Sequence, residues 1–127
     1  MNDRLKCIML IDDDEDDNFF HRLVIEESGI AESIKIAESA EDALLLLKNT
    51  EFNPELIFLD LNMPRINGLE FLDEFGRIKV DRNPVIVLLT TTAFPFNKET
   101  KSQELINAIE TKPLTDEKLK SILSRHF

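Results

Sequence analysis

The chain of 127 residues has no tryptophan or tyrosine, one cysteine and only three glycines. Cys7 has no partner for an internal disulfide, which fits a reducing compartment. The three glycines form no glycine-rich loop that could cradle phosphates, which disfavours nucleotide binding. No apolar run approaches the roughly 20 residues of a membrane-spanning helix, and the first residues have no signal-peptide pattern. We therefore expect a cytoplasmic protein without a membrane partner.

Positive charge is also scarce, because 15 lysines and arginines face 25 aspartates and glutamates, for a net charge of −10. Such a chain is repelled by phosphate backbones, so we expect no nucleic-acid partner. The length fits one domain, which we expect over residues 1–127. Six of the acids are adjacent, from Asp12 to Asp17, and this local concentration needs its own explanation.

Short continuous apolar runs indicate strands that are buried on both faces of a parallel sheet. The runs are Cys7–Ile11, Leu56–Leu59 and Val85–Leu89, and weaker strand signals lie at Ile34–Ala37 and before Lys112. Helical spacing or capping signals separate them, at 17–28, after Ser39, after Asn67, at 97–105 and after Thr115. Strand and helix thus alternate five times, which predicts a three-layer α/β sandwich with right-handed crossovers.

Polar residues stand where the predicted strands end. Asp12 and Asp13 follow the first strand, Asp60 follows the third, Thr90 ends the fourth and Lys112 ends the fifth. In open α/β sheets the functional crevice lies beyond the carboxyl ends of the strands, so we expect these side chains to converge. Polar loops alone would explain any one of these residues, but they do not explain the whole set.

The chemistry of this set points to a phosphoryl group. Close carboxylates repel one another and need a compensating cation. Hard oxygen ligands suit Mg²⁺, which in turn favours a phosphate oxygen as a partner. A lysine ammonium and a threonine hydroxyl can bind phosphoryl oxygens, and one carboxylate can act as a nucleophile that forms an acyl phosphate. The residues therefore predict reversible phosphorylation of an aspartate.

The motifs that carry these residues resemble those of the CheY-like response-regulator receiver domains of two-component signalling, over nearly the whole chain. They are Ile8–Asp13, Leu59–Pro64 with Gly68, Leu89–Thr91 and Lys112–Pro113. Each motif alone is weakly specific, whereas all of them in this order, each at a strand end, are highly specific. The resemblance implies a flavodoxin-like (βα)5 fold with a five-stranded parallel sheet in the order 2-1-3-4-5.

The resemblance also implies a role for each residue. Asp60 would be the phospho-acceptor, Asp13 a direct ligand of Mg²⁺ and Asp12 a ligand that acts partly through water. Asn62 would offer its backbone carbonyl to the metal. Asp13 with Asp14 is an alternative acidic pair, which we disfavour because the apolar run already ends before Asp12.

Two further residues complete the implied site. Thr90 would be the switch hydroxyl that moves toward the phosphoryl group, with Thr91 as the alternative that the spacing disfavours. Lys112 would pair with the phosphoryl oxygens, and the peptide bond between it and Pro113 would be cis.

The implied partners are a histidine kinase or histidine phosphotransfer protein as donor and a separate downstream protein, with the chain a monomer or weak homodimer. No effector domain is expected after Phe127. The chain would not be an enzyme, although it would assist its own phosphorylation and dephosphorylation. Ile109 stands where many receivers have an aromatic ring, which leaves open a degenerate receiver that binds a partner constitutively. A small phosphatase is disfavoured, because Asn62 stands where such enzymes have a general acid.

Several other residues have predicted surroundings. We expect Asp16 and Asp17 beside the positive N-terminus of the first helix, where they add negative potential near the metal. His21 is expected at the surface, and Phe19 and Phe20 in the core. The stretch 94–96, Phe-Pro-Phe, is expected to contact a partner or to fold back onto the fourth helix.

Overall fold

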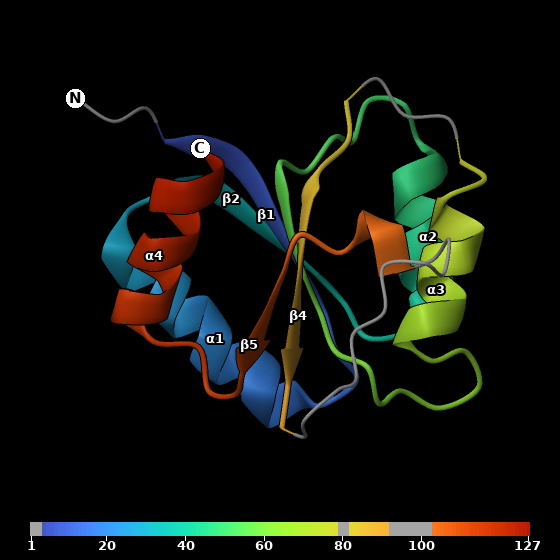
Figure 1. The fold of residues 1–127 in the computed structure, drawn as a ribbon, viewed down its shortest axis with the longest axis horizontal. Helices are drawn as coiled ribbons and strands as arrows, with labels where there is room; N and C mark the ends of the chain where they lie inside the picture. Colours follow the sequence, from blue (N-terminus) through green and yellow to red (C-terminus); the bar gives the residue numbers. More distant parts are fainter. Residues whose placement is uncertain (1–3, 79–81, 92–102) are drawn as a thin grey trace.

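The computed structural model describes residues 4–78, 82–91 and 103–127. Within these residues, five parallel strands form one sheet in the predicted order β2-β1-β3-β4-β5 (Figure 1). The strands are β1 (Leu5–Ile11), β2 (Ala31–Ala37), β3 (Leu56–Leu59), β4 (Val85–Thr90) and β5 (Ala108–Thr111).

Helices cover both faces of the sheet, which confirms the predicted three-layer α/β sandwich (Figure 1). One face carries α1 (Glu15–Ser28) and α4 (Asp116–His126), and the other carries α2 (Ala40–Lys48) and α3 (Gly68–Phe75). A short 3-10 helix, η1 (Gln103–Leu105), precedes β5. The helix predicted at 97–105 falls mostly outside the described residues, and the Phe-Pro-Phe stretch lies wholly outside them.

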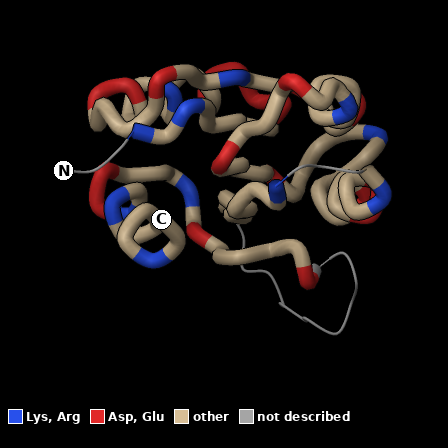
Figure 2. Tube along the Cα trace, turned by 90° about the horizontal axis from the view of Figure 1, so that it is seen from above, with Lys and Arg blue, Asp and Glu red and all other residues tan. Residues whose placement is uncertain are grey.

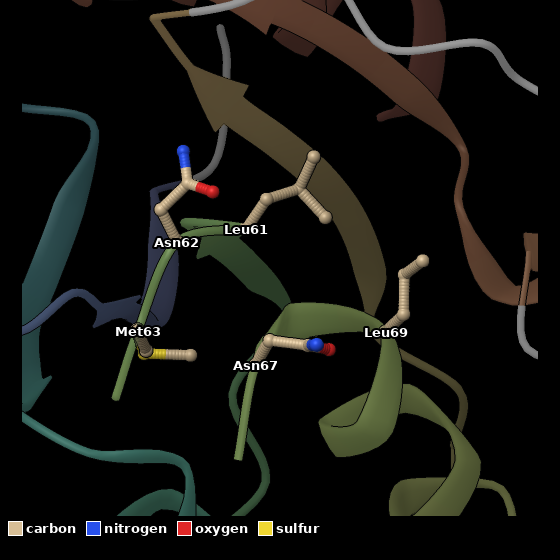
Figure 3. A pocket seen from close by; sticks show the side chains of 5 residues that line it. All are labelled: Leu61, Asn62, Met63, Asn67 and Leu69. Carbon is tan, nitrogen blue, oxygen red and sulfur yellow. The ribbon is translucent and has the colours of Figure 1, made fainter. Parts of the chain in front are cut away.

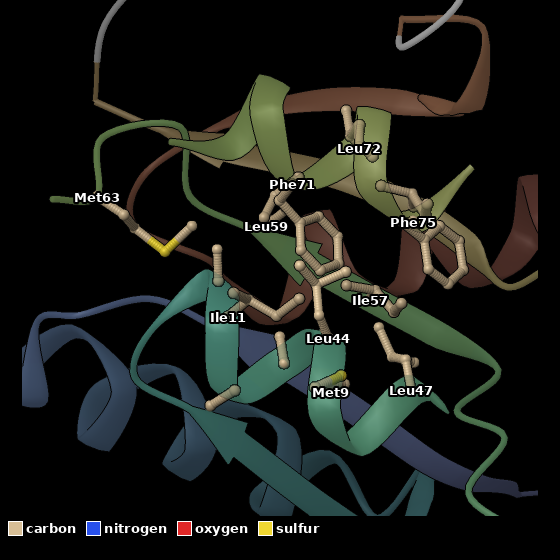
Figure 4. Packing of buried hydrophobic residues seen from close by; sticks show 14 of the residues in the cluster. Met9, Ile11, Leu44, Leu47, Ile57, Leu59, Met63, Phe71, Leu72 and Phe75 are labelled. Carbon is tan, nitrogen blue, oxygen red and sulfur yellow. The ribbon is translucent and has the colours of Figure 1, made fainter. Parts of the chain in front are cut away.

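The sheet separates two apolar clusters, because its central strands have apolar side chains on both faces. Every residue of β3 is buried, as the continuous run predicts for a central parallel strand. Figure 4 shows the cluster between the sheet and the α2–α3 layer. There the rings of Phe71 and Phe75 stack with their centroids 5.8 Å apart.

The predicted caps of α2, α3 and α4 and the predicted end of α1 are confirmed, whereas α1 begins at Glu15, two residues before the predicted start. Ser39, Asn67 and Thr115 cap the N-termini of α2, α3 and α4, and Asn67 forms a complete capping box with Glu70. Gly29 ends α1 in the left-handed conformation, with φ of 69°, which a residue without Cβ adopts at little cost.

The predicted orientation of α1 was wrong. His21 is buried, with 3% of its surface exposed, whereas Phe19 and Phe20 are 67% and 46% exposed. The inward face of α1 consists of Asn18, His21 and Ile25, which are spaced by one and two helical turns. This face is turned toward the polar end of the sheet, so amide and imidazole groups, rather than phenyl rings, line its first turns.

Acidic positions occur on several sides of the described chain and are not confined to one edge of the sheet (Figure 2). Among the described residues, no helix combines the length and the apolar character that crossing a membrane requires.

Candidate functional site

Three acidic side chains meet at the carboxyl edge of the sheet. Asp12 and Asp13 follow β1 and Asp60 follows β3, and one carboxylate oxygen from each lies within 4.8 Å of the others. Asp12 and Asp60 are buried, whereas Asp13 is exposed. The predicted convergence of the first acidic pair with Asp60 is therefore present in the fold.

Backbone hydrogen bonds place these residues by extending the sheet one step beyond its strands. The amide of Asp12 donates to the carbonyl of Ala37 at 3.1 Å, and the amide of Asp60 donates to Ile11 at 3.0 Å. The side-chain amide of Asn18 donates to the Asp12 carbonyl at 2.8 Å. These hydrogen bonds fix the backbone at the two buried aspartates.

Lys112 supplies the cation that faces these carboxylates. Its Nζ donates to Asp12 Oδ2 at 2.8 Å and to Asp17 Oδ2 at 2.7 Å, and it lies 3.7 Å from Asp60 Oδ1. Its amide donates to the Thr90 carbonyl at 2.8 Å, which ties the end of β5 to the end of β4. The Lys112 side chain is only 10% exposed, so water screens its charge little and the charge acts on the nearby carboxylates.

Burial and neighbouring charge change how these groups hold protons. Burial, reinforced by the Asp12 carboxylate, raises the pKa of Asp60 to about 6, although Lys112 and a hydrogen bond from the Asn62 backbone partly offset the rise. Burial alone would lower the pKa of Lys112, but its hydrogen bonds to Asp12 and Asp17 prevail and raise that pKa well above the ordinary lysine value. Lys112 is therefore cationic at every physiological pH.

The remaining predicted residues also lie at this edge. Thr90 is buried at the end of β4, whereas the alternative, Thr91, is exposed. The peptide bond between Lys112 and Pro113 is cis, as the resemblance implies. Asp14, the alternative acidic residue, instead caps α1 and accepts hydrogen bonds from the amides of residues 16 and 17.

The first turn of α3 packs directly on the backbone that carries Asp60. A Cβ at Gly68 would lie 2.9 Å from the Asp60 carbonyl oxygen and 3.0 Å from Leu61 Cα, closer than packed atoms come. The amide of Gly68 donates to the Leu61 carbonyl at 3.0 Å. Only glycine allows this approach without moving the backbone next to Asp60.

Gly68→Ala is expected to lower the free energy of unfolding by about 1–3 kcal/mol, because the added methyl overpacks against backbone atoms. Urea unfolding measures the loss. Gly76→Ala is the matched control, since a Cβ there would meet nothing closer than 3.4 Å and its φ of −62° suits alanine. Equal stability of the two variants would show that the close contact carries no strain.

An open pocket of about 370 Å³ lies beside the acidic cluster, along the loop that follows β3. Figure 3 shows the side chains that line it, which are Leu61, Asn62, Met63, Asn67 and Leu69. The pocket combines apolar and amide groups immediately after β3 and Asp60.

Three contacts of the site were missed from the sequence. Asp14 caps α1, Asn18 holds the Asp12 backbone, and Asp17 binds Lys112. A sequence signal existed for the last two, because residues 17 and 18 lie in the first turn of the helix that follows β1 and so near the same edge of the sheet.

The donor set fits Mg²⁺. The three carboxylates offer hard oxygen ligands, close enough together for one ion to contact an oxygen of each. Burial is the main cause of the raised pKa of Asp60, and the neighbouring Asp12 carboxylate adds to it, so the charged form of Asp60 lacks full compensation from Lys112. A divalent cation would offset that charge.

The sequence matches the family model of the response regulator receiver domain over residues 8–124. A two-component response regulator of Arabidopsis thaliana is 27% identical over 126 residues, which cover 98% of this chain and 85% of that protein. The crystal structure of a two-component response regulator from Cytophaga hutchinsonii superposes with a TM-score of 0.83 at 26% identity, covering 96% of each chain.

Some relatives are much longer. A protein-glutamate methylesterase/protein-glutamine glutaminase of Burkholderia thailandensis is 30% identical over 103 residues, which are 81% of this chain but 26% of that protein. The chain therefore spans about a quarter of the length of this relative.

Proposed function

The chain belongs to the response regulator receiver family, and from this premise we propose that it accepts a phosphoryl group on Asp60 in a Mg²⁺-dependent phosphorelay. The single observation that supports this most is the convergence of Asp12, Asp13 and Asp60 with Lys112 at one edge of the sheet. We propose a histidine kinase or histidine phosphotransfer protein as donor, a separate downstream protein as target, and a cytoplasmic setting.

The transfer would proceed by in-line attack. A carboxylate oxygen of Asp60 forms a bond to phosphorus while the bond from phosphorus to the donor imidazole nitrogen breaks. The imidazole leaves with the electron pair and takes up a proton. Positioning and charge stabilisation, rather than covalent catalysis by other groups, are the task of the surrounding residues.

The residues divide this task. The carboxylates of Asp12, Asp13 and Asp60, with the backbone carbonyl of Asn62, would hold Mg²⁺, which when bound offsets negative charge on the transferring group and on its ligands. Lys112 would donate to a phosphoryl oxygen, because its ammonium already lies 3.7 Å from the Asp60 carboxylate.

Thr90 would donate its hydroxyl to another phosphoryl oxygen and so couple the site to the loop after β4. The added negative charge then shifts the population of conformations at this end of the sheet, which a partner recognises. On this proposal the chain is a phospho-acceptor that promotes its own phosphorylation, and it is not a turnover enzyme.

Intact mass after incubation with acetyl phosphate tests this function. The expected result is a gain of one phosphoryl group that requires Mg²⁺ and is lost in Asp60→Asn. Asp73→Asn, the same change at an exposed position of α3, should retain the gain. A phosphoryl group on Asp60→Asn would refute the assigned acceptor, and no gain under any condition would favour a constitutive binding module.

A further inference from the structure

Lys112 is held from two directions, and one of its partners lies outside the acidic cluster. Its shortest carboxylate contact, 2.7 Å, is to Asp17 of α1, whereas its distance to Asp60 is 3.7 Å. Asp17 is neither the proposed acceptor nor one of the three residues that can hold a metal ion. The ammonium therefore lies between the proposed acceptor site and a carboxylate that takes no part in metal binding.

The start of α1 holds Asp17 in this place. Asp14 caps the helix and accepts hydrogen bonds from the amides of Asp16 and Asp17 at 2.9 and 3.1 Å. One residue further on, Asn18 is bonded to the Asp12 backbone, which fixes the helix against the end of β1. The helix start thus sets the position of the Asp17 backbone, and the short Asp17 side chain reaches the Lys112 ammonium from there.

Exposure distinguishes Asp17 from the other partners of Lys112. Its side chain is 37% exposed, whereas those of Asp12 and Asp60 are each 7% exposed. Asp17 can therefore keep its hydrogen bond to the ammonium when a phosphoryl group occupies the space near Asp60. Its negative charge persists through the reaction and acts on whatever anion approaches.

We propose that Asp17 is a positioning residue that holds the Lys112 ammonium and offsets part of its charge, and thereby slows phosphoryl uptake from multiply charged small donors. This proposal rests on the proposed role of Asp60 as acceptor. Asp17 would then determine donor specificity, because its charge slows phosphorylation by a donor with less negative charge to a smaller extent.

The chemistry of uptake explains the direction of the effect. With acetyl phosphate, an Asp60 oxygen bonds to phosphorus, the bond between phosphorus and the acetyl oxygen breaks, and acetate leaves with the electron pair. The donor enters as a dianion, and Asp17 adds one negative charge beside the cation that attracts it. At several ångströms in a partly solvated site, one unit charge changes a rate by about three- to tenfold.

Asp16→Asn provides a matched control for Asp17→Asn. Both residues lie in the first turn of α1, and both substitutions remove one charge from the positive end of the helix. Asp16 is exposed and has no ion pair with Lys112. A difference between the two variants therefore reports the contact with Lys112 and not the net charge. Asp17→Glu, which keeps the charge, should react at close to the wild-type rate.

The test measures initial rates of phosphoryl gain by intact mass, with acetyl phosphate and with phosphoramidate, a zwitterion of net charge near −1. Asp17→Asn should react about three- to tenfold faster than the wild type with acetyl phosphate, and by a clearly smaller factor with phosphoramidate. The ratio of the Asp17→Asn rate to the wild-type rate should fall at about 0.5 M salt, because salt screens the charge of Asp17. Asp16→Asn should stay within about twofold of the wild type.

A second readout tests the contact without the reaction. In metal-free protein, the ammonium protons of Lys112 should exchange with water at least several-fold faster in Asp17→Asn than in Asp16→Asn, as observed by ¹⁵N-resolved NMR. Equal exchange in the two variants would overturn the contact, and equal or slower phosphorylation of Asp17→Asn would overturn the charge effect.

The two proposals fail in different ways. If the wild type gains no phosphoryl group from either donor, the function proposed for Asp60 fails, and the role of Asp17 fails with it. If the wild type reacts and Asp60→Asn does not, while the variants at 16 and 17 behave alike, only the role of Asp17 is overturned.

Discussion

Replacing Lys112 with methionine is expected to lower the free energy of unfolding by about 3–5 kcal/mol in metal-free buffer near pH 8. Methionine keeps the length of the buried stem but removes the cation, so Asp12 and Asp60 are left as buried charges without a cationic partner. Urea unfolding measures the loss. Added Mg²⁺ should restore much of it, because a bound cation would take over the charge compensation.

The pH dependence of the stability lost in Lys112→Met follows from the pKa shifts of Lys112 and Asp60. The pKa of Lys112 is raised, so its pairing is present throughout the range below the ordinary lysine value and does not vary between about pH 6 and 9. The stability lost in Lys112→Met should shrink as the pH falls from 8, because without Lys112 the pKa of Asp60 lies above its wild-type value of about 6 and the carboxyl takes up its proton at a higher pH. Lys120→Met, which removes an exposed cation of α4, should leave stability unchanged within error. Equal effects at both lysines would contradict the prediction.

Asp60→Asn is expected to stabilise the metal-free protein at neutral pH by about 1–3 kcal/mol. The folded pKa of Asp60 is about 6, above its ordinary value of 3.8, so from about pH 4 to pH 6 the folded protein keeps a proton that the unfolded chain has released. The free energy of unfolding of the wild type therefore falls as the pH rises through this window. The loss, up to about 3 kcal/mol, persists at higher pH. Asparagine removes the deficit but also loses the attraction of Lys112.

Urea unfolding in chelator at about pH 4 and pH 7.5 measures this effect. The variant should exceed the wild type clearly at the higher pH and by much less at the lower one. A wild type whose stability relative to the variant is independent of pH would show that Asp60 titrates normally. A higher free energy of unfolding for Asp60→Asn at pH 7.5 would mean that the Asp60 carboxylate destabilises the metal-free wild type.

The sequence allowed the sheet and its functional edge to be predicted because both follow from strong local signals. A strand such as Leu56–Leu59 that ends at a charged residue specifies its own boundary, and parallel strands bring such boundaries together. The capping residues of α2, α3 and α4 were predicted for the same reason, since a cap is a contact within four residues. The strand order came from the family resemblance and not from the pattern.

The orientation of α1 and the partner of Asp17 could not be predicted in this way. Both depend on packing across the sheet edge, where polar residues are buried and the usual rule that apolar residues face inward fails. Phe19 and Phe20 are apolar, as core residues usually are, yet both are exposed. Asn18 and His21 are buried in their place, beside the acidic cluster. A helix that borders a charged site is thus the element for which hydrophobic periodicity is least reliable.

The six residues proposed to bind the metal ion or the phosphoryl group all follow or end strands at the carboxyl edge of the sheet, and none of them lies at the amino edge. The loop at 49–55 enters β3 at that opposite edge (Figure 1). Insertions, labels or fused peptides there would meet none of the six residues. The parallel sheet therefore separates an edge where almost any change affects the reaction from an edge where new attachments can be made, which is the practical basis for building a reporter on this fold.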